Sequence, residues 1–593
     1  MVTDLSERRI ATPAAETGTK LRRRTSWWIA VIGLALVLAV NLPLFVCMPL
    51  DTDATFYDVC ARSLLRHGAE YRDAMEHGLP GMTWLQTGVR SLVGWRSEAL
   101  RLVDLVVVAA VAWLLFGWLR SVGRSQTTAF SAVLVLSVFY FGISEWNHCQ
   151  RDVWMLLPAL AALRVRARQL QLFEREQSDR LMVVRNAFVE GLLWGIAFWI
   201  KPFVAVPALC CWTFGVVRTV RLVRRSGSRL ALDFLGLLAG GALIGAIGVA
   251  RLVLSGAWPS FWDVMLNWNP EYYEFARASG WTVERLSEMY RDLFPWILVH
   301  LLAVPMATYL LIRGLRRPRQ LASPAATRAL RQALLAALYL GWLFQACWQN
   351  LLEYIHVPPI ILALAVLASA EQPLRDRLLR RVTARARQRA SLRSVRFDRR
   401  VWLCLLVGFA AVALSRHPMF EPARLALWGR CFSEGSSPEI RDGLALTDHV
   451  DWQDLFQIEK AIKLFARTDG YVTCYSNGTQ AVYSELNLKP STRFVYLDTY
   501  LAAFPRHREQ ISQELMSSNQ GYVVTDLRTL GFWRLRRTHD SLGMILSPEL
   551  AYPKDKPIEF PWNEPVVIHS GSYFIQRVTK AEKPPLKSAK PTP

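Results

Sequence analysis

Several signatures of metal-binding and nucleotide-binding proteins are missing from this sequence of 593 residues. Its nine cysteines show no C-x-x-C spacing, which argues against a zinc site. There is no Walker-type Gly-rich loop and no dinucleotide fingerprint, so nucleotide use is not supported, and no internal repeat is evident. Cys431 and Cys474 are candidates for a disulfide outside the cytoplasm, although free thiols acting as small hydrophobes suit the scattered pattern better.

Acidic residues are also in short supply. The 48 Asp and Glu residues face 70 Lys and Arg residues, which gives a net charge of +22. Charged residues make up 20% of the chain, hydrophobic residues make up 52%, and the mean hydropathy is +0.18. The apolar residues gather in runs of roughly 17–22 residues, long enough to cross ~30 Å of hydrocarbon. This pattern excludes an ordinary soluble enzyme and a disordered protein.

The apolar runs predict a polytopic membrane protein with about eleven crossings. The first run is too long for a signal peptide and no small-residue cleavage site follows it, so we expect a retained helix. The break at Lys201-Pro202 separates two helices or bends a single one. The expected crossings are 27–48, 100–119, 127–145, 152–164, 186–200, 203–217, 230–254, 294–312, 332–349, 356–370 and 401–415.

Charge is distributed unevenly between the segments that join these runs. With the N-terminus inside, the cytoplasmic segments hold 36 Lys and Arg against 9 Asp and Glu, whereas the loops between crossings on the other side hold 9 against 16. This positive-inside pattern accounts for the pI near 9.9 without a nucleic-acid partner. The basic run Arg375–Arg400 is then a juxtamembrane anchor on anionic lipid.

The chain changes character after about residue 416, where the long apolar runs end. We expect a cytoplasmic tail over 1–26, a membrane domain over 27–415 with an outer loop over 47–99, an extracytoplasmic α/β domain over 416–580 and a disordered end over 581–593. In the α/β domain the spacing of apolar residues predicts helices at 451–466 and 505–517, strands at 471–476, 491–497 and 521–527, and a hairpin at 565–578.

The first outer loop holds the strongest candidates for chemistry. Asp51 and Asp53 follow the first apolar run directly, and Asp53 is placed to cap a helix that Gly68 would end as its C′ residue. That helix has one apolar face, which predicts that it lies in the membrane interface, and a polar stripe of Asp58, Arg62 and Arg66. Taken alone, the two aspartates suit helix caps, a general base or a cation site.

The order of residues in this loop is similar to that of a known family. The series Asp53-x-x-x-Tyr57, Gly68-x-x-Tyr71 and Gly78-Leu79-Pro80-Gly81 resembles the opening of the GT-C membrane glycosyltransferases. These enzymes use polyprenyl-phosphate sugars and include protein O-mannosyltransferases, the lipid A aminoarabinose transferase and bacterial lipopolysaccharide-core transferases. One departure is His77, in the neighbourhood where the family usually has a Lys. Weaker matches are Gln150-Arg151-Asp152, Gly195 with Lys201-Pro202, Tyr354-Ile355-His356-Val357-Pro358-Pro359 and Lys489-Pro490-Ser491-Thr492-Arg493-Phe494.

The resemblance implies an α-helical polytopic GT-C fold with a small extracytoplasmic α/β domain, in the lipids of a bacterial inner membrane. It also implies transfer of a sugar, with inversion, from a polyprenyl-phosphate donor to an extracytoplasmic acceptor, which is a glycolipid, a cell-envelope glycan or a protein hydroxyl. The general base is Asp53, with Asp51 as the competing candidate. The expected substrate-binding residues are Tyr57, His77, Arg151, Asp152, Lys201, Tyr354 and His356.

Three of these residues lie where a lipid phosphate would sit, and each also has a purely structural interpretation. Lys201 would snorkel to the interface, Arg151 would pair with Asp152, and His356 would be an ordinary interfacial histidine. Asp51-Thr52-Asp53 has the Asp-x-Asp form of a divalent-cation site, so a divalent cation is the one candidate cofactor.

Two other functions remain open from the sequence. A secondary transporter has a similar number of spans but holds its ions near the midplane and is built from internal repeats. A lipid-linked polysaccharide polymerase or ligase would share the donor but not the first-loop motif. The acidic outer loop and the large outer domain favour the glycosyltransferase.

Overall fold

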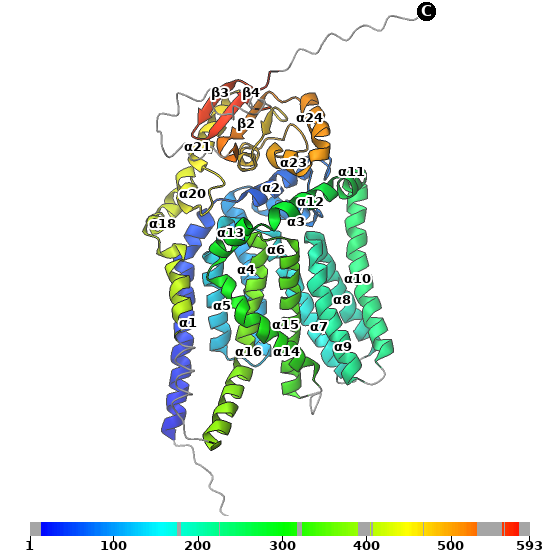
Figure 1. The fold of residues 1–593 in the computed structure, drawn as a ribbon, viewed down its shortest axis with the longest axis vertical. Coiled ribbons are helices and arrows are strands. Elements are labelled where there is room, and N and C mark those ends of the chain that lie inside the picture. The colour runs from blue at the N-terminus through cyan, green and yellow to red at the C-terminus, as the bar shows by residue number, and fades with distance from the viewer. Residues whose placement is uncertain are drawn as a thin grey trace, which may run out of the picture.

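Long helices run side by side along one axis, and a smaller α/β domain covers one end of the bundle (Figure 1). We call this end the domain end and the opposite one the far end. The computed structural model describes residues 13–174, 179–223, 226–316, 323–388, 404, 407–465, 468–530, 560–561 and 564–579. The predicted disordered end 581–593 and residues 1–12 of the predicted cytoplasmic tail lie outside the described residues.

Seven helices of the described chain are long and apolar enough to cross a membrane. This confirms the predicted fold class. The sequence predicts eleven crossings, four more than these seven helices. Because α8 and α9 each qualify, the Lys201-Pro202 break separates two helices and does not bend one. The seven stretches lie in α1 (Pro13–Cys47), α4 (Ser97–Ser121), α8 (Arg180–Ile200), α9 (Ala205–Leu222), α10 (Gly227–Leu254), α14 (Val299–Leu315) and α16 (Glu353–Gln388).

Further helices complete the bundle. The apolar α5 (Gln126–Phe141) packs against α1 and α4, and α7 (Leu156–Glu174) packs against α8 and α9. The helix α15 (Pro324–Gln349) lies between α14, α16 and α9. Residues 407–415, in the last predicted crossing, are also helical.

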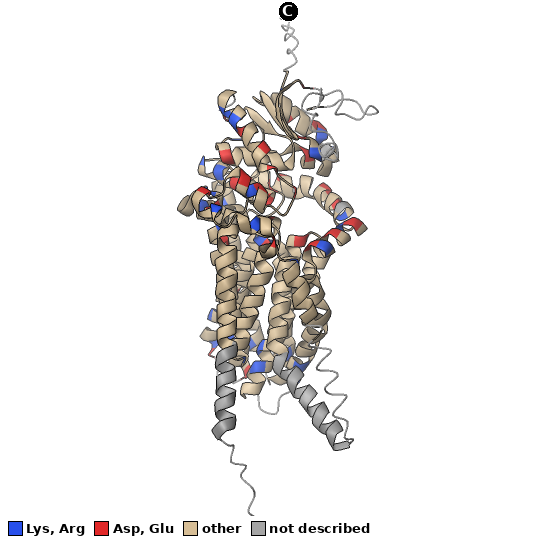
Figure 2. Cartoon of the chain, turned by 90° about the vertical axis from the view of Figure 1, so that its left-hand side faces the viewer, with Lys and Arg blue, Asp and Glu red and all other residues tan. Residues whose placement is uncertain are grey.

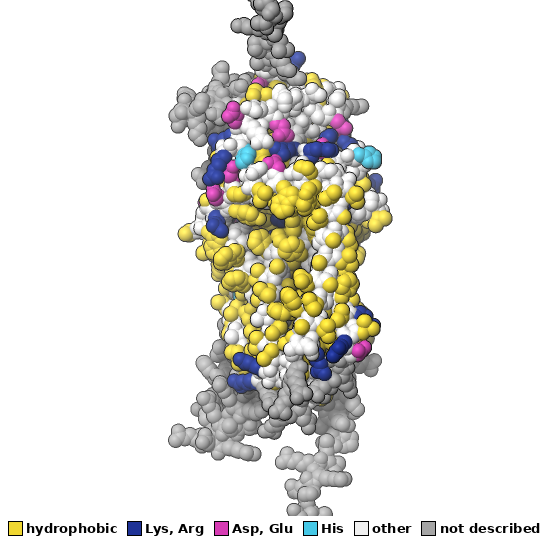
Figure 3. All heavy atoms as spheres, turned by 90° about the vertical axis from the view of Figure 1, so that its right-hand side faces the viewer, with side chains coloured by type: hydrophobic (Ala, Val, Ile, Leu, Met, Phe, Trp, Pro, Cys, Tyr) yellow, Lys and Arg dark blue, Asp and Glu magenta, His cyan; other side chains and the backbone are white. Residues whose placement is uncertain are grey.

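Charged residues lie in two layers. Figure 2 shows Lys and Arg gathered at the far end, both signs of charge at the domain end, and a band of the bundle between them that is nearly free of charge. The space-filling view shows that the surface of this band is largely hydrophobic (Figure 3). An apolar belt between polar ends is what a bilayer requires of the surface that faces it.

Glycine allows α8 and α10 to pack with their backbones in contact. A Cβ at Gly191 would lie 2.1 Å from the Leu237 carbonyl oxygen, and a Cβ at Gly240 would lie 2.1 Å from that of Phe188. Small residues of this kind are how membrane helices approach closely when no hydrophobic effect drives them together. The pair is also joined to α7 by a buried ion cluster, in which Arg166 binds Glu190 at 2.8 Å and Asp233 at 2.7 Å.

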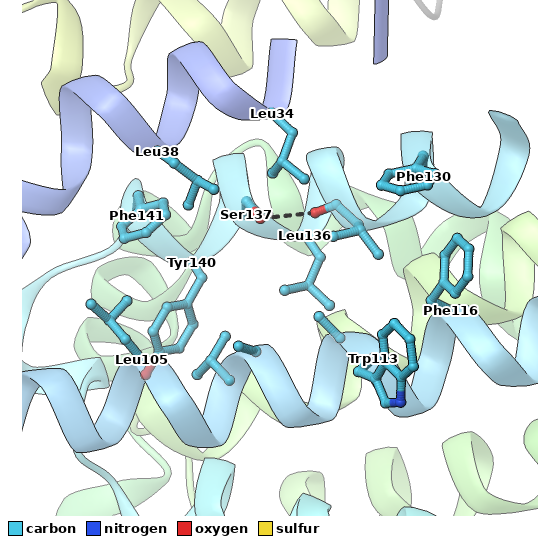
Figure 4. Close-up of a pocket in the computed structure, with 14 residues that line it drawn as sticks. Leu34, Leu38, Leu105, Trp113, Phe116, Phe130, Leu136, Ser137, Tyr140 and Phe141 are labelled. Carbon is cyan, nitrogen blue, oxygen red and sulfur yellow. Dashed lines mark hydrogen bonds between the residues drawn. The ribbon is translucent and has the colours of Figure 1, made fainter. Parts of the chain in front are cut away.

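An apolar cavity of about 270 Å³ lies between α1, α4 and α5 (Figure 4). Leu34 and Leu38 from α1 face Trp113 and Phe116 from α4 across it. Tyr140 also lines the cavity, and its hydroxyl donates to Asp104 at 2.6 Å. Since the lining holds no Asp, Glu, Lys, Arg or His side chain, this cavity lacks the charged groups of a polar site.

Short helices cross the domain end between the long ones. They are α2 (Thr52–Leu65), α3 (Gly81–Val93), α6 (Arg151–Trp154), α11 (Trp258–Asp263), α12 (Asn269–Gly280) and α13 (Val283–Leu293). The prediction that the first-loop helix lies in the membrane interface is wrong, because α2 is mostly buried and packs against α3 and the C-terminal domain. Its polar stripe reaches that domain: Arg62 donates to Asn487, and Arg66 binds Asp469 at 3.2 Å.

The C-terminal domain is built on one four-stranded sheet of order β1-β2-β4-β3. The strand β1 is parallel to β2, and β4 is antiparallel to both β2 and β3. The strands are β1 (Val472–Cys474), β2 (Tyr522–Asp526), β3 (Val566–Ser570) and β4 (Tyr573–Arg577), and the helices are α18 (Pro422–Ala426), α19 (Arg430–Glu434), α20 (Pro438–Leu444), α21 (Trp452–Phe465), α22 (Ala481–Leu486), α23 (Leu497–Ala503) and α24 (Arg508–Ser517).

One predicted strand of this domain does not form. Residues 491–496 are irregular, and α23 begins at Leu497. The reason is that the Arg493 carbonyl accepts a hydrogen bond of 2.8 Å from the Met75 backbone N–H of the first loop, so the segment pairs with the membrane part and not with the sheet.

The charge layers predict which side each end occupies. In an otherwise cysteine-free chain, Gln453→Cys in α21 should react with an impermeant maleimide from outside the cell, because the domain end has no excess of basic residues. Gln126→Cys at the far end of α5 should react only after the membrane is permeabilised. Labelling of both cysteines from the same side would contradict the assignment.

Candidate functional site

The site lies at the domain end, where the first loop leaves α1. Arg101 of α4 donates to the backbone carbonyls of Met48 and Pro49, which fixes the chain immediately before the two aspartates. Asp51 is the N-cap of α2, because its side chain accepts from the Asp53 backbone N–H at 3.4 Å. The prediction that Asp53 caps this helix is therefore wrong.

The end of α2 also differs from the prediction by one residue. The left-handed C′ position is occupied by His67, with a φ of 62°, and Gly68 follows as the C″ residue. Its N–H donates to the Ser63 carbonyl at 2.9 Å, the bond that closes a Schellman motif.

Asp53 is freed from capping and points into the site. Gln150 donates to its Oδ2 atom at 3.1 Å, and the Trp146 indole donates to the same atom at 3.4 Å. Among the described residues no donor reaches Oδ1, so this oxygen is open to a ligand. Burial, and after it the charge of Asp51, raises the pKa of Asp53 above its ordinary value, which makes it a stronger base.

Asp51 is bound by a histidine of the C-terminal domain. His449 Nδ1 lies 2.8 Å from Asp51 Oδ1, and the Thr52 hydroxyl donates to Oδ2 at 3.0 Å. The His449 ring also meets Trp146 edge-on at a centroid distance of 5.3 Å. Burial opposes protonation of His449, but the hydrogen bond and charge of Asp51 outweigh it and raise its pKa to about 9. At pH 7 the pair is therefore an imidazolium beside a carboxylate.

Lys201 and Asp152 form a buried ion pair. The Lys201 Nζ atom lies 2.8 Å and 3.0 Å from the two carboxylate oxygens of Asp152, and it faces the Tyr354 ring at 5.7 Å. The structural interpretations by which Lys201 snorkels and Arg151 pairs with Asp152 are both wrong, because Lys201 takes this partner. The pair joins the end of α8 to α6.

Arg151, next to Asp152 in the chain, is left without a counter-ion. Among the described residues no side chain or carbonyl forms an ion pair or hydrogen bond with its guanidinium, although its charge acts on Asp53, Tyr57 and Glu76. Gly78 makes room for it, since a Cβ there would lie 2.9 Å from Arg151 Nη1. A guanidinium without a partner among the described residues has the chemistry that suits an anionic ligand.

The remaining predicted residues line the same region. Tyr57 is 6% exposed, and burial raises the pKa of its phenol well above the ordinary value, so the hydroxyl stays neutral. Tyr354 packs its ring against Trp146 at a centroid distance of 5.5 Å. His356 is buried and its Nε2 lies 3.3 Å from the Asn350 carbonyl oxygen, which gives it a structural partner at the start of α16.

His77 does not replace the missing lysine as a cation. Its ring stacks on Tyr272 at a centroid distance of 4.4 Å and packs beside Tyr500 and Phe504 of the C-terminal domain. Burial, together with the charge of Arg151, lowers the pKa of His77 to about 3, so the ring is neutral. Its role in the structure is to join the first loop to the C-terminal domain.

Sequence reasoning missed two residues of this region. Glu76 is buried, its Oε2 accepts from the Thr83 hydroxyl at 2.7 Å, and Oε1 has no partner. Burial raises the pKa of Glu76 to about 7. The one feature of the sequence that could have pointed to Glu76 is that it directly precedes His77. For His449 there was none, because it is separated from Asp51 by 398 residues.

The Asp51-Thr52-Asp53 sequence has the form of a divalent-cation site, and the structure shows how its two carboxylates are bound. His449 and Thr52 occupy both oxygens of Asp51, so the two aspartates do not offer a shared pair of free carboxylates. Within the part of the chain that the structure describes, no group of three or more His, Cys, Asp and Glu side chains is arranged to hold a metal ion.

Comparison with solved structures identifies the fold. ArnT from Cupriavidus metallidurans bound to undecaprenyl phosphate aligns with a TM-score of 0.50 and 13% identity, over 93% of this chain and 98% of that chain. An oligosaccharyltransferase from Archaeoglobus fulgidus in the apo form aligns with a TM-score of 0.41 and 12% identity, over 85% of this chain and 70% of that chain. No protein-family model and no curated protein matches the sequence. The chain has the GT-C fold seen in ArnT, as its first loop predicted.

The link between His449 and Asp51 should stabilise the protein in a pH-dependent way. Because the pKa is raised from 6.5 to about 9, the contribution is fully present below pH 6.5 and is lost as the pH rises through 9. The His449 side chain is 40% exposed, so solvent screening reduces the effect to about 1 kcal/mol. His449→Gln should therefore lower the thermal midpoint at pH 6 and change it little at pH 10, measured by intrinsic fluorescence.

His67→Asn provides the matched control, because His67 is exposed and asparagine tolerates its left-handed backbone. This variant should match the wild type at both pH values. An equal destabilisation by His449→Gln at pH 6 and pH 10 would show that the ion pair is not the cause.

Proposed function

We propose that this protein is an integral membrane glycosyltransferase that moves a sugar from a polyprenyl-phosphate donor to an extracytoplasmic acceptor hydroxyl. The observation that carries the proposal is the unpaired guanidinium of Arg151 beside the open Oδ1 of Asp53, in a GT-C fold. One group suits the anionic leaving group and the other suits the proton of the attacking hydroxyl. The solved ArnT of similar fold is bound to undecaprenyl phosphate, which supports a lipid-phosphate donor.

The reaction requires a base on one side of the anomeric carbon and a cation on the other. Asp53 Oδ1 accepts the proton of the acceptor hydroxyl while the hydroxyl oxygen bonds to the anomeric carbon. The bond from that carbon to the phosphate oxygen breaks with its electron pair, which leaves a polyprenyl phosphate and inverts the anomeric centre. The raised pKa of Asp53 brings the base closer to neutral pH, where proton transfer is most efficient.

Arg151 receives the charge that develops on the departing phosphate. Its N–H donors have no partner among the described residues, so they are available to the phosphate oxygens during the reaction. The ion pair with Asp152 holds the Lys201 ammonium group in one position, so its positive charge stays in place. Tyr57 and Tyr354 present neutral aromatic surfaces in the same region, which suits the sugar ring.

The orientation of the chain follows from the same proposal. The domain end faces the extracytoplasmic side of a bacterial inner membrane, and the N-terminus lies in the cytoplasm, because the far end carries the basic excess. The acceptor, a glycolipid, a cell-envelope glycan or a protein hydroxyl, then approaches between the first loop and the C-terminal domain.

Asp53→Asn tests the base. Asparagine keeps the shape and a hydrogen-bonding oxygen but cannot take a proton, so transfer from a labelled polyprenyl-phosphate sugar in proteoliposomes should fall at least about a hundredfold. The matched variant Asp51→Asn should lose less activity, because Asp51 caps α2 and binds His449 without facing the free space. If Asp53→Asn retains more than half of the wild-type rate, Asp53 is not the base.

Arg151→Gln tests the phosphate site. Loss of the Arg151 guanidinium, which has no partner among the described residues, should weaken binding of polyprenyl phosphate about tenfold or more, measured by competition with a fluorescent lipid phosphate in nanodiscs. The control Arg285→Gln removes an arginine of α13 that pairs with Glu288 at the surface, and it should leave binding unchanged. Equal binding by Arg151→Gln and the wild type would place the phosphate elsewhere.

A further inference from the structure

Two cysteines from distant parts of the chain meet at the domain end. Cys47 is the last residue of α1, and Cys431 lies in α19, 384 residues later. The Cys47 thiol donates to the Cys431 carbonyl oxygen at 3.6 Å. Both residues are buried, at 3% and 7% exposure.

The elements around the two thiols hold them in place from both sides. The Ser436 hydroxyl donates to the Cys47 carbonyl at 2.9 Å, and the Trp428 indole donates to the Ala39 carbonyl of α1 at 3.1 Å. The remaining space is filled by apolar side chains, which belong to Leu44, Met48, Ile440 and Leu444. The two cysteines are therefore neighbours in one packed cluster, and such proximity is the first requirement for a disulfide.

The pairing suggested by the sequence, Cys431 with Cys474, does not fit this arrangement. Cys474 ends β1 inside the sheet, where its thiol donates to the Thr479 carbonyl at 3.2 Å. Cys431 packs against α1 and not against the sheet.

We propose that Cys47 and Cys431 form a disulfide in the mature protein. The bond ties the domain end of α1 to the segment that leads into the C-terminal domain. It rests on the proposed orientation, in which the domain end faces an oxidising compartment where disulfides persist.

Formation of the bond is a balanced exchange with an extracytoplasmic thiol–disulfide oxidoreductase. Cys431 loses its proton, and its thiolate attacks the disulfide of the oxidoreductase and forms a mixed disulfide. The Cys47 sulfur then displaces the oxidoreductase. The two thiols lose two protons and two electrons, and the oxidoreductase leaves as a dithiol. Because the folded pair is buried, this exchange precedes docking of α19 on α1.

The proposed bond lies beside the site. Asp51 follows Cys47 by four residues, and His449 follows Cys431 by eighteen. A covalent bond between the two cysteines therefore limits how far Asp51 and His449 can separate.

Counting free thiols in the full-length protein tests the proposal. Membranes are treated with N-ethylmaleimide at lysis, and the purified chain is denatured with more reagent and weighed by mass spectrometry. Seven of the nine cysteines should be alkylated without reduction and nine after reduction, with a linked peptide pair containing Cys47 and Cys431. Nine adducts without reduction would overturn the proposal.

Two variants show which cysteines are involved. Cys47→Ser should give eight adducts with or without reduction, whereas Cys474→Ser should give six without reduction and eight after it. Dithiothreitol should lower the thermal midpoint of the wild type to that of Cys47→Ser and leave Cys47→Ser unchanged. These measurements do not depend on transfer activity, so the disulfide and the proposed function succeed or fail separately.

Discussion

The ion pair between Lys201 and Asp152 determines which cation is free at the domain end. Three charged groups, Arg151, Asp152 and Lys201, converge in a space where a buried charge needs a partner. One carboxylate cannot compensate two cations. Because the ammonium group takes both oxygens of Asp152, the guanidinium is left facing Asp53 and the open space. The same pair fixes α6 to the end of α8, so the position of the free cation is set by the packing of the bundle.

The C-terminal domain forms part of the site. In the sequence, no local group of acids and bases marks this domain as part of a site. The structure shows that the domain contacts the first loop directly, because His449 binds Asp51, and Tyr500 and Phe504 pack against His77. Arg493 of the domain binds Glu514 at 3.3 Å, and its guanidinium lies over the ring of Trp268. These contacts hold the domain against the first loop, in which Asp51 and Asp53 lie.

Long apolar runs and a local motif were enough to predict the fold class and the loop that holds the site. Both depend on neighbours in sequence, as hydropathy and helix spacing do. Two of the errors depend on groups far away in the chain, whereas the shift by one residue at the end of α2 is local. In the sequence alone, Asp51 and Asp53 suit a helix cap equally well. In the structure, Arg101 binds the Pro49 carbonyl just before them, and Asp51 is the residue that caps α2. The spacing of residues 491–497 predicts a strand, but in the structure the Arg493 carbonyl accepts a hydrogen bond from the Met75 backbone N–H of the first loop.

The separation of 398 residues between Asp51 and His449 also has a consequence for biosynthesis. The ribosome makes α1 and the first loop early, whereas His449 emerges only after the membrane helices have been synthesised. A nascent chain thus holds Asp51 without its imidazolium partner throughout insertion. The polar space around Asp53 is completed in the last quarter of translation, so a truncated or stalled chain cannot assemble it.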